Sequence, residues 1–510
     1  MEVKPLNVLV VSSEAVPYAK TGGLADVAGA LTRELARVGH SVRLVIPRYG
    51  TIDGSAHGFK KWTDLLVPIA LGSIRATVEQ GILPDSKVPV LAVRHDPYFG
   101  RAGLYQEGGT DYPDNLERFA FFCRAVMELI PVLERETGWA PDILHGHDWQ
   151  TGLCMVYPRT LYAADRLVGR LGTLFTIHNI GYQGLFPATD YWKTGLGLDL
   201  FAPTALEFYG SLNLLKGGLV FADLLTTVSP TYSREIQTGA LGFGLEGVLR
   251  ERKNRLVGVV NGIDVDLWNP ATDSHLPNRY SLSDLSGKRA CKAALQKELK
   301  LPVRDVPVLG IVSRLAAQKG LDLVADILPE LVTLDVQIAL LGTGEPSLEG
   351  LFRLLHTQHP DKVGLHIGFD EGLAHRIEAG SDMFLMPSRY EPCGLTQLVS
   401  LRYGSIPVVR RTGGLADTVV PFRPLTVREG RATGFVFGEA TGDALLSAIL
   451  LALRVYDNPK EWASLVHAGM SADVSWAKSA RSYADLYHQV LALRADPRAG
   501  RLPGVTPTSA

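Results

Sequence analysis

The sequence predicts an α/β protein built from two Rossmann-like domains, each with a doubly wound parallel sheet. Short apolar runs alternate with amphipathic stretches along most of the 510 residues, which is the pattern of repeated βαβ units. The alternation weakens after about residue 265 and resumes near residue 307. In addition, the hexapeptide Thr-Gly-Gly-Leu-Ala-Asp follows an apolar run in each half, at 21–26 and at 412–417. The two halves are therefore predicted to contain the same kind of strand-to-helix turn.

Length, composition and charge agree with this prediction and argue against several classes of protein. A chain of 510 residues favours more than one core, and 46% hydrophobic with 20% charged residues is typical of a globular protein. A nucleic-acid or membrane surface needs clustered Lys and Arg, whereas the formal net charge is −2. Every apolar run is shorter than the roughly 20 residues of a membrane helix. We expect no nucleic-acid partner and no membrane association.

The cysteines predict a reducing compartment. Cys123, Cys154, Cys291 and Cys393 are scattered, and none forms a C-x-x-C pair, so neither a disulfide framework nor a zinc site is indicated. The N-terminus lacks the basic segment, uncharged apolar core and small-residue cleavage site of a signal peptide. We therefore expect a cytoplasmic protein.

The first domain is expected to span 1–264. An apolar run at 6–11 precedes an amphipathic helix, which Gly39 is suited to end. Helical patterns separate most of the strands that are expected to follow. These strands are at 42–46, 88–93, 143–145, 173–177, 224–228 and 257–260.

An interdomain linker is expected at 265–305, because Pro, Asp and Ser interrupt the pattern there and leave one charged helix. The second domain is expected to span 306–475. A helix at 476–493 fits against either domain, and 494–510 is expected to be a disordered tail rich in Pro, Gly, Thr and Ser. Strands of the second domain are expected at 308–312, 337–341, 364–367, 383–386 and 406–409.

The glycine pairs at 22–23 and 413–414 lie where strands of the two sheets end. Two such sheets are expected to face each other across a cleft, with ligands beyond the carboxyl ends of the strands. Glycine allows close approach of the backbone, and a helix N-terminus is partly positive, so both turns suit an anionic ligand. Reuse of a stable turn without function is the alternative.

The second domain contains two polar turns that follow strands. Arg314 and Lys319 flank the turn between a strand and a helix, where two cations suit a pyrophosphate. A solvated basic loop is the alternative. Glu391 stands just before another helix start. It is either an ordinary first-turn charge or a ligand of sugar hydroxyls, with the N–H groups from Cys393 to Thr396 meeting a phosphate.

The first domain contains polar residues after two of its strands. The segment 145–148 holds two histidines and an aspartate, a spacing compatible with a fragment of a metal site. No third cluster completes the set, so we expect no metal. His178 is compatible with a core histidine. Its place at a strand end, before Asn179 and Tyr182, favours a loop that contacts a sugar.

Seven motifs, in order along the chain, resemble those of bacterial glycogen synthases and plant starch synthases. The motifs are Lys20-Thr21-Gly22-Gly23-Leu24-Ala25-Asp26, His147-Asp148-Trp149-Gln150, Thr176-Ile177-His178-Asn179, Thr227-Val228-Ser229-Pro230, Val260-Asn261-Gly262-Ile263-Asp264, Ser313-Arg314 with Lys319-Gly320, and Glu391-Pro392-Cys393-Gly394-Leu395-Thr396-Gln397. The similarity extends from about residue 6 to residue 493. It implies a two-domain GT-B glycosyltransferase whose C-terminal helix returns to the first domain.

The resemblance also implies the reaction. Glucose is transferred from ADP-glucose to the 4-hydroxyl at the non-reducing end of an α-1,4-glucan such as glycogen, with retention of configuration and without a cofactor. Both a covalent intermediate and a front-face route are compatible with retention. Lys20, Gly22 and Gly23 are implied to contact the diphosphate and glucose from one side. Arg314 and Lys319 are implied to hold the diphosphate from the other.

The same resemblance implies that His178 contacts the donor glucose beside the anomeric carbon. It implies that Glu391 binds glucose hydroxyls or stabilises the cationic sugar. Further substrate contacts are implied at Asp26, Asp148, Asn179, Asn261, Cys393, Gly394, Leu395 and Thr396.

Two alternatives remain open at this stage. One is a related transferase that uses UDP-glucose or another acceptor. Many such enzymes have a second glutamate eight residues after the first, where this chain has Val399. The other is a non-catalytic glucan-binding protein on the same fold, which loss of Lys20, Arg314, Lys319 or Glu391 would favour, and all four are present. A Rossmann dehydrogenase is excluded because no G-x-G-x-x-G follows the first strand.

Overall fold

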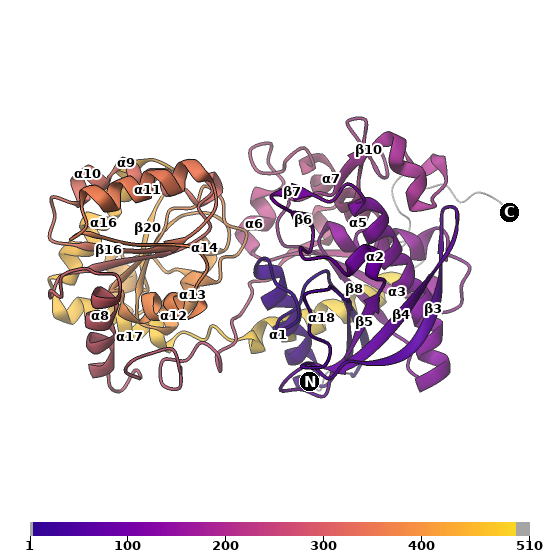
Figure 1. Cartoon of the computed structure of the whole chain (residues 1–510), viewed down its shortest axis with the longest axis horizontal. Coiled ribbons are helices and arrows are strands. Elements are labelled where there is room, and N and C mark those ends of the chain that lie inside the picture. The colour runs from indigo at the N-terminus through magenta and orange to yellow at the C-terminus, as the bar shows by residue number, and fades with distance from the viewer. Residues whose placement is uncertain (1–3, 496–510) are drawn as a thin grey trace. The chain divides into compact units, whose positions relative to one another are not determined.

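The computed structural model describes residues 4–495, which form two compact α/β units (Figure 1). Unit 1 contains residues 4–228, 233–259 and 476–495, and unit 2 contains Ser229–Tyr232 and Val260–Ser475. Each unit is built around its own mainly or wholly parallel sheet. The predicted fold class is confirmed.

Within the described residues, the main sheet of unit 1 has nine strands in the order β14-β13-β9-β8-β1-β2-β5-β4-β3. The strands from β14 to β5 are parallel, and β4 and β3 add an antiparallel hairpin. Chain order reverses between β1 and β8, which is the topological switch point of this sheet. The bounds are β1 Asn7–Val11, β2 Ser41–Pro47, β3 Lys60–Ile69, β4 Gly72–Ile82, β5 Pro89–Arg94, β8 Ile143–His147, β9 Gly172–Ile177, β13 Leu224–Thr227 and β14 Leu256–Gly258.

Helices and small sheets complete unit 1. The α-helices are α1 Gly23–Arg37, α2 Asp96–Phe99, α3 Asn115–Thr137, α4 Leu153–Val156, α5 Leu214–Phe221, α6 Pro230–Glu235, which crosses the unit boundary, α7 Glu246–Glu251 and α18 Trp476–Ala495. The short strands are β6 Gln106–Glu107, β7 Thr110–Asp111, β10 Leu185–Pro187, β11 Glu207–Phe208 and β12 Ser211–Asn213. The 3₁₀ helices are η1 Trp149–Thr151, η2 Tyr157–Arg159, η3 Val168–Arg170, η4 Ala188–Thr194, η5 Leu198–Leu200 and η6 Lys253–Arg255.

Helix α18 packs on unit 1, although about 215 residues separate it from the preceding part of that unit (from Val259 to Trp476). It contacts α1 and β9, and Figure 1 shows it in yellow beside α1. Tyr487 lies within hydrogen-bond distance of His145 in β8, at 2.8 Å. A Cβ at Gly172 would stand 2.7 Å from Val490, so glycine at this position permits the helix to approach β9. The disordered tail was predicted from residue 494, but Arg494 and Ala495 are the last two residues of α18, and the rest of the predicted tail lies outside the described residues.

In the described part of unit 2, the sheet has six parallel strands in the order β17-β16-β15-β18-β19-β20. In chain order this is 3-2-1-4-5-6, so the switch point lies between β15 and β18. The strands are β15 Val308–Val312, β16 Gln337–Gly342, β17 Val363–Ile367, β18 Met383–Met386, β19 Ile406–Arg410 and β20 Phe435–Phe437. The helices are α8 Ser286–Glu298, η7 Ala317–Lys319, α9 Leu321–Asp326, α10 Leu328–Leu331, α11 Pro346–Gln358, α12 Glu371–Gly380, α13 Thr396–Arg402, α14 Gly413–Thr418, α15 Pro424–Arg428, α16 Gly442–Tyr456 and α17 Pro459–Ser471.

The segment 265–305, expected as a linker, belongs to unit 2. Its helix α8 packs on α12, and Cys291 lies in the core. Asp273 is buried, with Oδ2 accepting a bond from Tyr403 Oη at 2.6 Å and lying 2.7 Å from His375 Nδ1. The Trp268 ring stacks on His375 at 3.9 Å between centroids. These partners are about 100 residues away in sequence, so local composition could not reveal them.

Replacing Asp273 with Asn is expected to lower the free energy of unfolding by about 1–3 kcal/mol at pH 7, because two buried groups lose their charged partner. Burial alone raises the pKa of Asp273, but hydrogen bonds from His375, Tyr403 and the His275 N–H outweigh it and lower the pKa overall. A lowered folded pKa means that the stabilisation is complete above about pH 5 and is lost as the pH falls.

Denaturant unfolding at pH 7 and at about pH 3.5 measures the contribution of the Asp273 charge. The difference in the free energy of unfolding between the wild type and Asp273→Asn is expected to shrink at the lower pH. The control is Asp457→Asn, an exposed position, where the expected change is within about 0.5 kcal/mol. A difference that does not vary with pH would contradict a role for the charge.

Candidate active site

In unit 1, the turn after β1 is organised by Glu14, a residue that the sequence interpretation missed. The buried Glu14 carboxylate accepts bonds from the N–H groups of Thr21 and Gly22 and from the Thr21 hydroxyl at 2.6 Å. The Tyr105 hydroxyl also donates to Glu14, at 2.7 Å. The backbone N–H groups of Thr21 and Gly22, just before α1, therefore already bind an anion that the chain itself supplies. An acidic residue shortly before a glycine pair was the available signal.

The part of this turn around Gly22 is exposed and leaves room for a ligand. A Cβ at Gly22 would meet no described atom within 4 Å, so a ligand has room to approach the backbone. Lys20 Nζ pairs with Asp26 Oδ1 at 2.8 Å, and both side chains are substantially exposed. An exposed pair of this kind is weak and exchanges partners easily. Lys20, Gly22, Gly23 and Asp26 are thus gathered on one accessible turn.

Asp148 and His178 meet at the ends of β8 and β9, which are neighbours in the sheet. Asp148 Oδ1 accepts a bond from the His178 N–H at 2.7 Å. Burial raises the pKa of Asp148 to about 7, although the N–H groups of His178 and Asn179 oppose the shift. Asp148 also has a φ of 55°, an uncommon conformation for a residue other than glycine. Asp148 therefore holds the loop that begins at His178.

His178 is buried, and burial lowers its pKa to about 3. It is therefore neutral near pH 7 and suited to hydrogen bonding rather than to donating a full proton. Asn179 Oδ1 accepts a bond from the Gly181 N–H at 3.0 Å, so that oxygen shapes its own turn. His145, by contrast, lies between Tyr487 and Thr176 and has a role in packing.

In unit 2, Lys319 and Glu391 come together at the switch point between β15 and β18. Lys319 Nζ lies 2.6 Å from Glu391 Oε2, and the Ser388 hydroxyl donates to the same oxygen at 3.0 Å. Glu391 is buried, whereas Lys319 is partly exposed. Arg314, on the same turn as Lys319, is exposed and its Nη2 lies 3.4 Å from Gln318 Oε1. A cation, a paired carboxylate and a second cation therefore occupy one end of this sheet.

The second glycine pair does not present free donors, which corrects the sequence interpretation. Gly414 donates its N–H to the carbonyls of Glu391 and Pro392, both at 3.1 Å. A Cβ at Gly413 would stand 1.8 Å from the Glu391 oxygen, and one at Gly414 would stand 2.0 Å from the Cys393 oxygen. These glycines are required because two loops pack backbone to backbone. The two copies of the hexapeptide thus have different roles.

The segment from Cys393 to Thr396 leads into α13. Burial raises the pKa of the Cys393 thiol to about 12, although hydrogen bonding with Asn261 opposes the shift, so this thiol is a neutral packing group. Gly394 has a φ of 71°, which favours glycine. Leu395 is the N-cap of α13, and no side chain caps this helix start. The first N–H groups of α13 are therefore available to an anion.

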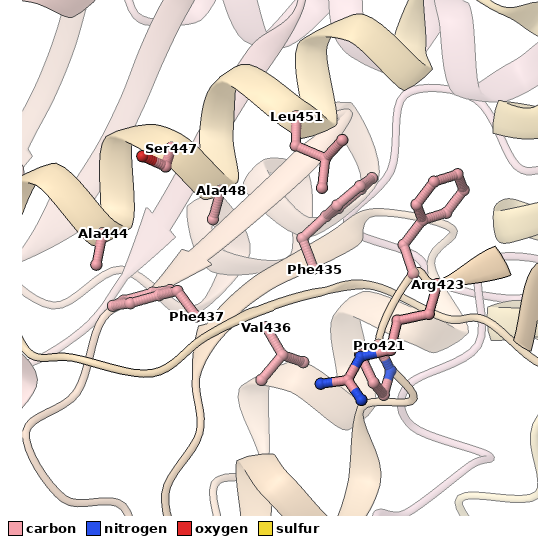
Figure 2. A pocket seen from close by; sticks show the side chains of 10 residues that line it. Pro421, Arg423, Phe435, Val436, Phe437, Ala444, Ser447, Ala448 and Leu451 are labelled. Atoms are coloured by element: carbon pink, nitrogen blue, oxygen red, sulfur yellow. The ribbon is translucent and has the colours of Figure 1, made fainter. Parts of the chain in front are cut away.

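One further feature lies apart from these groups. An apolar pocket in unit 2 is lined by side chains around β20 and α16, with Arg423 and Ser447 as its polar members (Figure 2). It contains none of the predicted site residues.

Across residues 4–495, His, Cys, Asp and Glu side chains form no group of three or more that could hold a metal ion. In the same range, no helix is both long and apolar enough to cross a bilayer.

The fold and these residues define the class: a glycosyltransferase with two α/β domains. Residues 7–251 match the starch synthase catalytic domain, and residues 295–464 match the glycosyl transferases group 1 family. The glycogen synthase of Anaeromyxobacter sp. (strain Fw109-5) is 50% identical over 96% of this chain and 100% of that protein. The glycogen synthase of Desulforudis audaxviator is 47% identical over 98% and 99%. The chain belongs to the glycogen synthase family and is a hexosyltransferase.

A solved structure agrees with this assignment. The catalytic domain of Starch Synthase IV from Arabidopsis thaliana, bound to ADP and acarbose, superposes with a TM-score of 0.88 at 34% identity. The alignment covers 96% of this chain and 100% of that one. The resemblance found in the sequence motifs is confirmed over nearly the whole chain.

Proposed function

We propose that this protein transfers glucose from ADP-glucose to the 4-hydroxyl at the non-reducing end of an α-1,4-glucan, such as glycogen, with retention of configuration. The observation that carries the proposal is the pairing of Lys319 with Glu391 beside Arg314, at the switch point of unit 2. The similar starch synthase is described as bound to ADP, and the similar bacterial proteins are glycogen synthases.

The enzyme must first stabilise the negative charge on the leaving diphosphate. Arg314 and Lys319 are proposed to offset this charge, assisted by the uncapped N-terminus of α13. Preorganised cations and backbone donors stabilise such charge without a metal or another cofactor. On unit 1, Lys20 and the open turn at Gly22 and Gly23 are proposed to contact the diphosphate and glucose of the donor.

The enzyme must also bind the glucose that is transferred. Glu391 Oε2 is occupied by Lys319 and Ser388, and the carboxylate is proposed to bind glucose hydroxyls or stabilise positive charge on the sugar. His178 is neutral and is proposed to hydrogen bond the glucose near the anomeric carbon. The remaining predicted contacts are proposed to bind substrate or to shape the loops that do so, as at Asp26, Asp148, Asn179, Asn261, Cys393, Gly394, Leu395 and Thr396.

A cytoplasmic location is proposed as well. All four cysteines are free and buried. Free thiols persist most easily in a reducing compartment, where ADP-glucose and glycogen would also be the partners.

Supplying ADP-glucose and UDP-glucose separately with glycogen tests the donor. We expect nucleotide release and polymer growth with ADP-glucose, and a kcat/KM at least about tenfold lower with UDP-glucose, a difference of about 1.4 kcal/mol. Faster transfer from UDP-glucose would identify the alternative transferase. Glycogen binding without release of either nucleotide would identify a non-catalytic glucan-binding protein.

A further inference from the structure

His147 lies directly beside His178 and is not among the residues proposed to contact substrate. It ends β8, next to Thr176 in the neighbouring strand β9. His147 Nδ1 stands 2.9 Å from His178 Nε2, which is a hydrogen-bond distance between two ring nitrogens. His147 is completely buried. The His147 ring also packs against the ring of His145, with 4.2 Å between the ring centroids.

The ring of His145, which packs against His147, is itself fixed by hydrogen-bond partners. Both ring nitrogens of His145 have partners, namely the Tyr487 hydroxyl at 2.8 Å and the Thr176 hydroxyl at 2.7 Å. Tyr487 belongs to α18, so the C-terminal helix packs against the histidine that supports His147. The His147 ring therefore has little freedom to turn, and its nitrogen remains aimed at His178.

Only one proton can lie between His147 and His178. Burial lowers the pKa of His178 to about 3 and lowers that of His147 well below its usual value, with neighbouring histidines adding to the effect on His147. Both rings are therefore neutral near pH 7, and each has one N–H group. Either His147 donates from Nδ1 or His178 donates from Nε2.

The surroundings of His147 determine which of the two histidines donates this hydrogen bond. Its Nε2 atom is buried and has no hydrogen-bond partner among the described residues. If His178 donated, the single proton of His147 would sit on this Nε2 and would be a buried donor without an acceptor, which is rare in proteins. If His147 donates from Nδ1, its Nε2 has only a lone pair. The proton of His178 is then on Nδ1.

We propose that His147 is a positioning residue that fixes His178 in the tautomer with hydrogen on Nδ1, so that His178 offers an N–H donor to a hydroxyl of the transferred sugar. This inference rests on the proposed function, in which His178 contacts the donor glucose. His147 touches no substrate in this arrangement. It acts through the orientation and the protonation pattern of its neighbour.

Two variants of equal size separate the hydrogen bond from the packing. His147→Asn keeps an N–H donor near the place of Nδ1, whereas His147→Leu has the same branching without a donor. Partners that orient metal-binding histidines are worth about 10- to 100-fold in activity, and kcat is expected to fall by a comparable factor in His147→Leu. In His147→Asn it is expected to stay within about fivefold of the wild type. The affinity for ADP, measured by calorimetry, should be unchanged in both, because His178 serves the sugar.

Nitrogen-15 spectra of histidine-labelled protein report the tautomer directly. The signals of His178 are identified by their loss in His178→Asn. In the wild type they are expected to show Nδ1 protonated and Nε2 unprotonated, and in His147→Leu this pattern should be lost. If His147→Leu does not fold, His147→Gln replaces it. The longer amide of Gln reaches past the Nδ1 position, so kcat is expected to be as low as predicted for Leu.

Three results would overturn the inference: an Nε2-protonated His178 in the wild type, wild-type kcat in His147→Leu, or equal losses in Asn and Leu variants that both fold. Failure of the proposed function looks different. In that case the wild type would not transfer glucose from ADP-glucose at all, while the spectra would still determine whether His147 fixes the tautomer of His178.

Discussion

Replacing Lys319 with Ala is expected to lower kcat by roughly 10²-fold or more, equivalent to about 2.7 kcal/mol of lost transition-state stabilisation. Lys319 lies 2.6 Å from Glu391 at the switch point of unit 2, so its loss removes a cation from the leaving diphosphate. It also leaves the buried Glu391 with Ser388 as its remaining hydrogen-bond donor among the described residues. Some loss of stability is therefore expected, and kinetics should be measured well below the unfolding temperature.

Two further variants complete this test. Lys319→Met keeps the length of the side chain without its charge and is expected to lose as much kcat as the Ala variant. Lys297→Ala removes an exposed lysine from α8 of the same unit and is expected to leave kcat unchanged. A near-normal kcat in a folded Lys319→Ala protein would rule out the proposed role on the diphosphate.

Changing Glu391 to Gln is expected to lower kcat by about 10²-fold while the affinity for ADP hardly changes. The substitution keeps the size of the side chain but removes the charge that Lys319 and Ser388 now bind. If the carboxylate stabilises positive charge that develops only in the transition state, its loss affects kcat and not ground-state binding. Steady-state kinetics and calorimetric titration with ADP measure the two effects separately.

Glu439→Gln, at an exposed position of unit 2, is the control for Glu391→Gln. The combination of Lys319→Ala with Glu391→Gln is expected to cost less than the sum of the two single changes, because residues in contact share one interaction energy. A large loss of ADP affinity with unchanged kcat would assign Glu391 to the nucleotide instead of the sugar.

Local signals were sufficient for most of the fold. The predicted strands are present within two residues at each end, because buried parallel strands are continuous apolar runs. The hairpin of β3 and β4 and the edge strand β20 of unit 2 were missed. In the hairpin, buried positions alternate with exposed or half-buried ones over parts of each strand, and Lys60, Lys61, Asp64, Arg75 and Glu79 are charged, which weakens the apolar signal.

The candidate site was predictable wherever turn chemistry was local. Arg314, Lys319 and Glu391 each follow a strand, and their residue types suit phosphate and sugar. The contact between Lys319 and Glu391 was not predictable, because 72 positions separate them and only the order of β15 and β18 in the sheet makes them neighbours. Glu14 was missed because its part in the turn depends on packing against Tyr105, 91 residues away.

By itself, the sequence determined the class of fold, the two sets of polar residues at strand ends, and a resemblance that identified the family. Periodicity, turn residues and motifs are properties of short segments, so they can be recognised before the chain is folded. Only the tertiary structure decided that the second glycine pair packs against the loop at Glu391 and that His147 meets His178. These contacts depend on which strands are adjacent and on how closely their loops approach, and neither is encoded in any short segment.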